Sequence, residues 1–246
     1  MTVTPDLDRR FREAAAAEGL LDVGFDVVDS PIGPLLVAAT GRGLARIFFD
    51  AEPELHLHRL AKTFGPRVLR SASSVDAAHR QLDQYFAGER SAFELDVDLS
   101  GAAPFAQHVL DELARVPYGQ TTTYGALAAK VGAPGAARAV GTVMNRNPIP
   151  IVLPCHRVVG ANGNLTGYAG GLDVKERLLR LEGALLYSER RARRPQQRAG
   201  QLGHEVLQLG HGPGGPPPVS IRTTVIPARY SVPCETPHTP LQWLCV

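Results

Sequence analysis

The chain has 246 residues, enough for two modest domains, and 44% of them are hydrophobic, enough for a packed core. Residues 1–100 carry 11 basic and 16 acidic side chains. Residues 101–187 carry 8 basic and 5 acidic side chains, and residues 188–246 carry 7 basic and 3 acidic ones. We therefore expect a polyanionic partner to meet the second half of the chain. No stretch approaches the roughly 20 apolar residues that span a bilayer, and the charged N-terminus lacks the apolar core of a signal peptide. We therefore expect a cytoplasmic protein with no membrane anchor, whose thiols are kept reduced.

The first hundred residues predict a helical extension at residues 1–23, followed by an α+β domain at residues 24–100. Apolar residues at helical spacing predict helices, and short apolar or alternating runs predict strands. The expected helices cover residues 5–20, 55–64 and 75–86, and the expected strands cover residues 25–34 (ending in a turn), 35–40, 44–49 and 93–99. Because glycine-containing turns separate the first three strands, we expect them to form an antiparallel meander.

A second, mostly helical domain is predicted at residues 101–188. The expected helices run from Phe105 to the residue before Pro117, from Tyr124 to about Val131 with Thr123 as the cap, and over residues 136–144. The last two are separated by a short Gly- and Pro-rich turn, which predicts a helix-turn-helix. The final helix presents a face of small residues with one long cation, Arg138. Two interpretations stay open: this helix packs tightly on a neighbour, or it faces DNA.

The segment after these helices is predicted to be extended at residues 147–150 and then to form an apolar strand that ends at Cys155. A turn is expected at residues 160–163, and residues 166–171 form a flexible loop that could lie over a pocket. Asp173 is expected to cap a last helix that ends at Glu182. The composition then becomes rich in arginine, glycine and proline, which predicts a disordered tail at residues 189–246.

Cys155 is the candidate nucleophile, because the other cysteines, Cys234 and Cys245, lie in the predicted tail. Burial raises the pKa of a thiol, so a base or a cation must compensate. His156 follows directly, but neighbouring side chains of a strand point to opposite faces, so contact requires a bend or a bridging water. Glu182 opposes the dipole of its helix and is expected to have a partner, which His156 could supply. A merely structural role for each of these three residues also stays open.

The run Pro154-Cys155-His156-Arg157-Val158 matches the active-site signature of the alkylguanine–DNA alkyltransferases, the methylated-DNA–protein-cysteine methyltransferases. Further matching motifs, in family order, are Tyr118-Gly119, Thr123-Tyr124, Ala136 to Gly141, Asn147-Pro148, Tyr168 to Gly171, and Lys175-Glu176 through Glu182-Gly183. Residues 105–183 resemble the family strongly, and residues 24–99 resemble its N-terminal domain. The resemblance implies an α+β fold: a ribonuclease-H-like α/β domain with antiparallel strands, then a mostly helical domain containing a helix-turn-helix.

The resemblance also implies direct DNA repair by a protein that acts once and needs no cofactor. Cys155 would take an alkyl group, such as methyl, from oxygen-6 of guanine and keep it as a thioether; oxygen-4 of thymine is a second candidate. His156, through a water, would take the thiol proton, and Glu182 would orient the imidazole. Asn147 would fix the bend before the active-site segment, and Tyr124 would donate a proton to the departing guanine.

The implied partner is double-stranded DNA carrying alkylated guanine, bound by a monomer. The helix at residues 137–146 would enter the minor groove, where Arg138 would fill the gap left by the extruded base. The residues implied in DNA contact are Arg138, Tyr124, Ala137, Gly141, Met144 and Asn145. The residues implied in the pocket for guanine and its alkyl group are Val158, Tyr168 and Ala169, with Lys175 supporting the loop.

The sequence departs from some members of the family in two places. Ala169 stands where some members have a serine that donates a hydrogen bond to the guanine oxygen, so here only the backbone could donate. Residues 1–100 contain no cysteine, so we expect neither the N-terminal zinc site of some members nor any other metal. The phosphotriester-repair domain of the bifunctional members is also absent from the sequence.

Two alternative functions are considered beside repair. One is non-catalytic lesion binding of the alkyltransferase-like type, in which the cysteine is usually replaced by tryptophan; the presence of Cys155 argues against it. The other is a cysteine hydrolase, for which the sequence carries no dedicated signal of an oxyanion hole.

Overall fold

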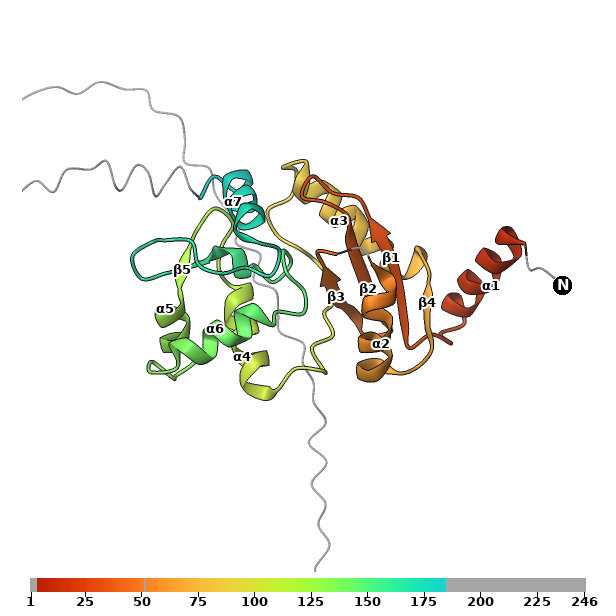
Figure 1. The fold of residues 1–246 in the computed structure, drawn as a ribbon, viewed down its shortest axis with the longest axis horizontal. Coiled ribbons are helices and arrows are strands. Elements are labelled where there is room, and N and C mark those ends of the chain that lie inside the picture. The colour runs from red at the N-terminus through yellow and green to blue at the C-terminus, as the bar shows by residue number, and fades with distance from the viewer. Residues whose placement is uncertain (1–3, 51, 185–246) are drawn as a thin grey trace, which may run out of the picture. The chain divides into compact units, whose positions relative to one another are not determined.

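A four-stranded sheet organises the N-terminal half of the computed structural model, which describes residues 4–50 and 52–184 (Figure 1). Its strands are β1 Val23–Val28, β2 Leu35–Thr40, β3 Gly43–Phe48 and β4 Val68–Arg70, in the order β3-β2-β1-β4. β1, β2 and β3 pair antiparallel, which confirms the predicted meander. β4 pairs parallel with β1 and was not predicted, because three residues are too few to show an alternating pattern.

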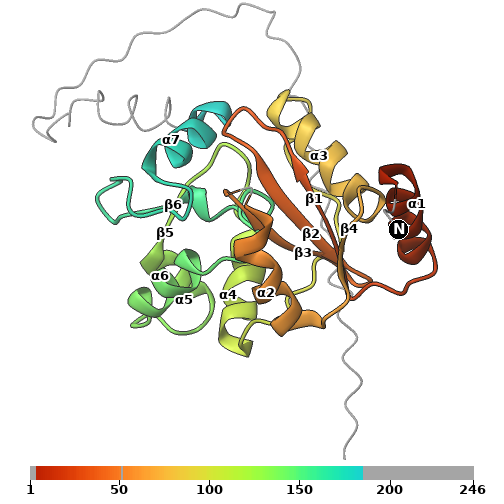
Figure 2. The ribbon, with the colours of Figure 1, turned by 45° about the vertical axis from the view of Figure 1, so that its right-hand side comes forward.

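Both faces of this sheet are covered. This follows from β2, which begins with five consecutive buried residues, so side chains on both of its faces are shielded from solvent. The helices of this half are α1 Pro5–Ala17, α2 Pro53–Phe64 and α3 Asp76–Phe86, the last preceded by the 3-10 turn η1 Ser73–Val75. Leu36 packs with Leu60 of α2 on one face, and Leu35 packs with Leu82 of α3 in the larger core on the other. Figure 2 shows the ribbons of α2 and α3 beside the sheet. Each of these leucines is at most 1% exposed, and such burial contributes about 1.5–3 kcal/mol per side chain.

The strand predicted at residues 93–99 is wrong. Only Val97 forms a bridge, to Leu44, through hydrogen bonds between the Leu44 backbone and the residues on either side of Val97. The apolar alternation of this segment serves side-chain burial instead, since Phe93, Leu95 and Val97 pack against the larger core. An alternating pattern therefore reports which side chains face inward, whereas a strand also requires a continuous edge to pair with.

The C-terminal half is mostly helical. Its elements are α4 Pro104–Ala114, β5 Thr122–Thr123, α5 Tyr124–Lys130, α6 Ala137–Asn145, the 3-10 turn η2 Cys155–Arg157, β6 Val158–Val159 and α7 Leu172–Leu181. The side chain of Thr123 accepts a hydrogen bond from the backbone N–H of Ala126 at 3.1 Å, which confirms it as the cap of α5. α5 and α6 pack against each other across the short turn, as predicted for a helix-turn-helix. The two-residue parallel pairing of β5 with β6 was not predicted.

The apolar strand predicted to end at Cys155 is also wrong. The chain makes a tight turn there: Ile151 has a φ of 75°, and the only pairing within the segment is a bridge between Pro150 and Leu153. Proline has no N–H to donate to a sheet ladder, and Pro148 and Pro150 both precede the turn. The apolar side chains are buried in the core instead, and Cys155 opens the 3-10 turn η2.

The predicted cap of the last helix is wrong as well. α7 begins at Leu172, after Gly171, which has a φ of 88° and makes no side-chain cap. Asp173 lies inside the first turn, where a carboxylate still favours the positive end of the helix dipole. The predicted tail, residues 189–246, lies outside the described residues.

One hydrophobic core joins the two halves. It contains sheet residues such as Val37, helix residues such as Leu113 of α4, and Cys155 itself. A backbone hydrogen bond from Ile47 to the carbonyl of Pro148, at 3.0 Å, ties β3 to the loop before the active-site segment. Among the described residues, no helix is long and apolar enough to cross a membrane.

Candidate active site

The thiol of Cys155 is buried, with 4% of the residue exposed. Burial raises the pKa of Cys155 to about 11, although a hydrogen bond with Asn147 and the charge of Lys175 act in the opposite direction. Asn147 also holds the turn, since its Nδ2 donates to the carbonyl of Leu153 at 2.7 Å and its Oδ1 accepts from Ile149 N at 3.1 Å. At neutral pH the sulfur therefore keeps its proton until a base removes it.

A base lies on the next residue. His156 is fully buried, and its Nε2 lies 2.8 Å from Oε1 of Glu182. Burial lowers the pKa of His156 despite the neighbouring carboxylate, so the imidazole is neutral at physiological pH. Because an ionised carboxylate only accepts hydrogen bonds, Nε2 carries the proton and Nδ1 carries the lone pair. Nδ1 is buried and has no hydrogen-bond partner among the described residues. The Cys155 thiol contacts the backbone N–H of His156 and not its ring.

The carboxylate of Glu182 accepts hydrogen bonds from several residues of the site. Arg157 holds it with two hydrogen bonds, Nε to Oε2 at 2.9 Å and Nη2 to Oε1 at 2.8 Å. Burial alone would raise the pKa of Glu182, but the hydrogen bonds and charges of His156 and Arg157 bring it down to about 2. Glu182 is therefore ionised at any pH at which the protein operates, and it fixes the tautomer of His156.

Tyr85, on α3 in the N-terminal half, also binds this carboxylate. Its hydroxyl donates to Oε1 of Glu182 at 2.7 Å, and the residue is fully buried. Burial, followed by the charge of Glu182, raises the pKa of Tyr85 far above its ordinary value, so the hydroxyl remains a donor. The sequence analysis missed Tyr85, because nothing local marks it, and it gave Arg157 no role although Arg157 belongs to the active-site signature.

Lys175 ties the active-site segment to the loop that follows it. Its Nζ donates to the carbonyl of Val158 at 2.6 Å and to the carbonyl of Thr166 at 3.0 Å, and the residue is fully buried. Tyr124 approaches the same loop, since its hydroxyl lies 2.7 Å from Oγ1 of Thr166. Thr166, at the start of this loop, is thereby held by residues of both α5 and α7.

Tyr168 and Ala169 lie at the other end of this loop. The ring of Tyr168 contacts that of His156 edge-on, with centroids 6.4 Å apart, and packs on Phe49 of the N-terminal half at 5.4 Å. The Tyr168 hydroxyl is buried without a hydrogen-bond partner among the described residues, and Ala169 is exposed. Tyr168 and Lys175 thus contact the segment that carries Cys155 and continues into Val158, whereas Ala169 is exposed and lines a separate cleft.

The expected DNA-contacting residues of α6 do not all share one face. Arg138 and Asn145 are exposed and Ala137 and Gly141 are half-buried, but Met144 is 5% exposed and packs in the core. The expectation that Met144 contacts DNA is therefore corrected, because its side chain points inward. Tyr124 lies on the outer side, with its ring 3.8 Å from the point where a Cβ on Gly141 would stand. The helix packs on the core through Val140 and Met144, as the first interpretation of this helix requires. Its small residues lie toward the surface, as the second interpretation requires.

A metal site was not expected, and the described residues hold no group of three His, Cys, Asp or Glu side chains that could bind one. A buried thiol beside a neutral imidazole and an ionised carboxylate, next to a helix-turn-helix, defines a class of protein: one that uses a cysteine nucleophile at DNA.

Comparisons with known proteins define the family. Residues 24–99 match the 6-O-methylguanine DNA methyltransferase ribonuclease-like domain, and residues 104–184 match the DNA binding domain of the same name. The methylated-DNA–protein-cysteine methyltransferase of Methanosarcina acetivorans is 44% identical to this chain, over 65% of this chain and 98% of its own length. The protein of the same name from Mycobacterium leprae is 48% identical, over 63% of this chain and 89% of its own length. The chain belongs to the methylated-DNA–protein-cysteine methyltransferase family.

Solved structures agree with this assignment. The crystal structure of Mycobacterium tuberculosis OGT in complex with DNA has a TM-score of 0.57 and 40% identity, covering 65% of this chain and 93% of that one. The O6-methylguanine-DNA methyltransferase of the archaeon Pyrococcus kodakaraensis has a TM-score of 0.50 and 27% identity, covering 65% and 99%. The family and the α+β fold class expected from the sequence are both confirmed.

Proposed function

We propose that this chain repairs DNA directly, with Cys155 as the acceptor of an alkyl group from oxygen-6 of guanine. The sulfur attacks the alkyl carbon in line with the carbon–oxygen bond; a carbon–sulfur bond forms as that bond breaks, and its electron pair goes to the guanine. The thiol proton passes to Nδ1 of His156 through a water, and Tyr124 supplies a proton to the departing base. The thioether does not hydrolyse readily, so each molecule acts once.

The arrangement of His156 carries this proposal. Its Nε2 is committed to Glu182 at 2.8 Å, and its buried Nδ1 keeps a free lone pair next to the residue that bears the thiol. A neutral base of this kind suits a nucleophile whose pKa is about 11, because the sulfur gains its negative charge only as it reacts. Because Glu182 stays ionised, it supplies the fixed counter-charge that the imidazolium needs when it forms during transfer.

The DNA is proposed to lie across α5 and α6. Arg138 is exposed at the start of α6, and Gly141 and Tyr124 lie together beside it, so a narrow, small-residue face meets a groove only about 6 Å wide. Arg138 would take the place of the extruded base, and Asn145 would contact the strand at the other end of the helix. Arg138→Ala is expected to weaken binding to methylated duplex without lowering methyl transfer from free O6-methylguanine.

Mass spectrometry of the intact protein after incubation with an O6-methylguanine duplex tests the function. The expected result is one added methyl group per molecule, which peptide mapping places on Cys155. Cys155→Ala is expected to gain no mass while still binding the methylated duplex. Repeated turnover, or a methyl group on another residue, contradicts the proposal.

Non-catalytic lesion binding is not favoured, since the residue at the signature position is a cysteine with a base beside it. The reaction consumes a reduced thiol, so we propose the cytoplasm, where thiols are kept reduced, as the place where the protein works. Fractionation that finds the protein only in an oxidising compartment would contradict this location.

A further inference from the structure

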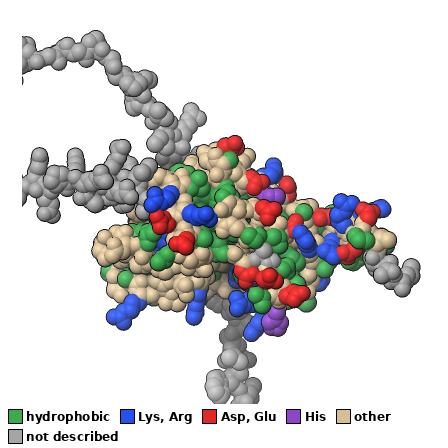
Figure 3. All heavy atoms as spheres, turned by 45° about the horizontal axis from the view of Figure 1, so that its top comes forward, with side chains coloured by type: hydrophobic (Ala, Val, Ile, Leu, Met, Phe, Trp, Pro, Cys, Tyr) green, Lys and Arg blue, Asp and Glu red, His purple; other side chains and the backbone are tan. Residues whose placement is uncertain are grey.

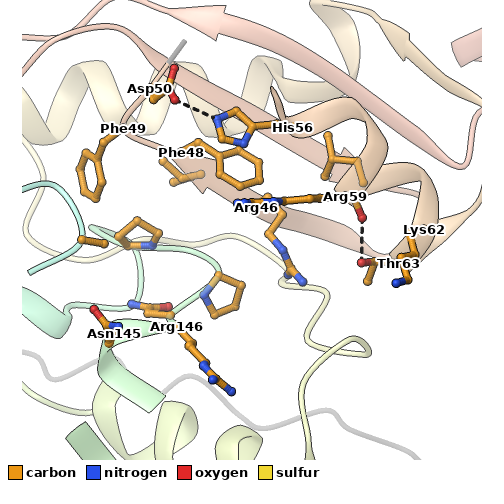
Figure 4. Close-up of a pocket in the computed structure, with 16 residues that line it drawn as sticks. Arg46, Phe48, Phe49, Asp50, His56, Arg59, Lys62, Thr63, Asn145 and Arg146 are labelled. Carbon is orange, nitrogen blue, oxygen red and sulfur yellow. Dashed lines mark hydrogen bonds and ion pairs between the residues drawn. The ribbon is translucent and has the colours of Figure 1, made fainter. Parts of the chain in front are cut away.

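A cleft of about 560 Å³ lies between the N-terminal half and the end of α6. Figure 4 shows residues of β3 and α2 on one side of it, and Asn145 and Arg146 on the other. Cys155 does not line this cleft, although Asn147 and Ala169 form part of its wall. Nothing in the transfer chemistry uses its α2 side.

Four cations line this cleft: Arg46 on β3, Arg59 and Lys62 on α2, and Arg146 at the end of α6. None of them forms an ion pair with another described residue. The carboxylate in the wall, Asp50, lies 3.5 Å from Nε2 of His56 instead. The cleft therefore concentrates positive charge in a half of the chain whose overall balance is acidic.

The other arginines of the N-terminal half behave differently. Most of them pair with an aspartate within 4.0 Å: Arg9, Arg12, Arg42, Arg67, Arg70 and Arg80. Figure 3 shows basic and acidic side chains next to one another over α1, where two of these pairs lie. The unpaired cations of the cleft are thus a local departure from how this half neutralises its charge.

Of the four cations, Arg46 gives the clearest indication of an anionic ligand. It is half-buried, its guanidinium lies 5.1 Å from the centroid of the Phe64 ring, and its Nη1 donates a hydrogen bond to the carbonyl of Ala45. Burial lowers the pKa of Arg46, which reports incomplete compensation of its charge. The charge of Asp98 acts against this lowering without reversing it, so the buried guanidinium remains costly, and an anionic ligand would offset that cost.

The cleft also continues the proposed DNA face. Arg138 and Arg146 stand at opposite ends of α6, about 12 Å apart at 1.5 Å per residue. One strand of DNA carries a phosphate about every 3.4 Å along the helix axis, so a strand that passes Arg138 reaches the mouth of the cleft within three to four phosphates. The DNA backbone is therefore the anion that the proposed function brings close to these side chains.

We propose that the cleft lined by Arg46, Arg59, Lys62 and Arg146 binds the phosphate backbone of the DNA strand that flanks the lesion. This inference rests on the proposed function, because the DNA must first lie on α6. The N-terminal half then contributes directly to DNA binding, through phosphate contacts that hold the duplex without reading its sequence.

The test uses Arg59→Ala/Lys62→Ala, which removes cations only from α2 and leaves α6 unchanged. The affinity for a methylated duplex is measured over a series of salt concentrations, since each phosphate contact adds about 0.9 to the slope of log K against log salt. We expect the slope of the double variant to be shallower by roughly 1.8, with weaker binding at low salt. The matched control is Arg10→Ala/Arg80→Ala, which removes the same charge from exposed positions on α1 and α3 and should leave the slope at the wild-type value.

Methyl transfer from free O6-methylguanine separates this inference from the function beneath it. The free base has no phosphate, so both double variants should react with it at the wild-type rate, which also shows that they are folded. A salt slope in Arg59→Ala/Lys62→Ala equal to that of the wild type overturns the phosphate cleft. If the wild type itself fails to gain a methyl group, the proposed function fails instead.

Discussion

The thiol of Cys155 and the imidazole of His156 are matched in their protonation. Burial raises the pKa of the thiol to about 11 and lowers that of the imidazole below its usual 6.5. Over the range between these values, the sulfur holds a proton and Nδ1 of His156 holds a lone pair. The pair can therefore transfer a proton during the reaction without a prior, costly ionisation of the buried thiol.

The pH dependence of transfer follows from this pairing. With His156 present, the single-turnover rate on saturating methylated duplex should be flat from about neutral pH to pH 9 and should fall only below 6.5. His156→Ala should be slower by roughly 10²–10⁴-fold at neutral pH, and its rate should rise about tenfold per pH unit toward the thiol pKa of about 11. A flat profile in the variant would mean that His156 is not the base.

Acid stability should also depend on this residue cluster. The pKa of Glu182 is lowered from 4.5 to about 2, so its contribution is present above 4.5 and is lost as the pH falls toward 2. The lowered pKa of His156 acts in the same direction, because the unfolded chain binds the proton first. The free energy of unfolding should fall by about 3 kcal/mol through Glu182 alone. In thermal melts, the deficit of Glu182→Gln relative to the wild type should shrink as the pH falls; a constant deficit would contradict the assignment.

At the scale of elements, α6 has one face that packs in the core and one exposed face that is proposed to contact DNA. Val140 and Met144 are buried in the core, whereas Arg138 and Asn145 are exposed. Whether a residue of α6 is buried or exposed depends on how the helix is rotated about its own axis. That rotation is set by the elements against which the helix packs. Met144 was therefore predicted to contact DNA although it holds the helix in place.

The two faces can be separated by substitution. Met144→Ala should lower the free energy of unfolding by about 2–5 kcal/mol, because a buried side chain is replaced by a cavity. Asn145→Ala, one residue further along, should change it by no more than about 0.5 kcal/mol. Denaturant titration measures both, and equal effects would mean that Met144 is not buried in solution.

The turn between α4 and β5 depends on a glycine. Gly119 has a φ of 71°, and a Cβ there would stand 2.9 Å from the backbone carbonyl of Glu182. Gly119→Ala should therefore cost about 1–3 kcal/mol and disturb the position of Glu182. Gly125→Ala is the control: the space around Gly125 in α5 is open, so the helix should gain up to about 1 kcal/mol there. Thermal melts of the two variants should shift in opposite directions.

At the scale of the whole molecule, the N-terminal half contributes side chains to the candidate active site. Tyr85 reaches from α3 to Glu182, a separation of 97 residues in the chain, and Phe49 packs on Tyr168. The sheet and the C-terminal helices share one core, so they hold these contacts fixed. The N-terminal half thus helps to position Glu182, the carboxylate that is proposed to orient the base.

Tyr85→Phe tests this coupling. Losing a hydrogen bond to a carboxylate costs about 1.5–3 kcal/mol, so the transfer rate should fall and its acid limb should move, because Glu182 holds His156 less firmly. Tyr118→Phe is the matched control: its hydroxyl donates at 3.1 Å to the carbonyl of Leu181, not to the carboxylate. Single-turnover rates across pH compare the two. An unchanged profile in Tyr85→Phe would make Tyr85 a packing residue only.

By itself, the sequence determined the family, the meander and the helices, and it singled out Cys155 as the proposed reacting residue. These depend on local information: hydrophobic periodicity, glycine turns, the Thr123 cap, and a signature of five consecutive residues around Cys155. The strands predicted at residues 93–99 and before Cys155 failed because apolar alternation reports burial, and whether a segment pairs depends on edges supplied by distant residues.

Only the tertiary structure decided how the site is assembled. The carboxylate of Glu182 collects donors from α3, η2 and the turn after α4, and the sequence shows none of those distances. Burial of Met144 and the gathering of unpaired cations between α2 and α6 arise in the same way. The physical reason is that burial and charge compensation are set by neighbours in space, whereas sequence patterns record neighbours along the chain.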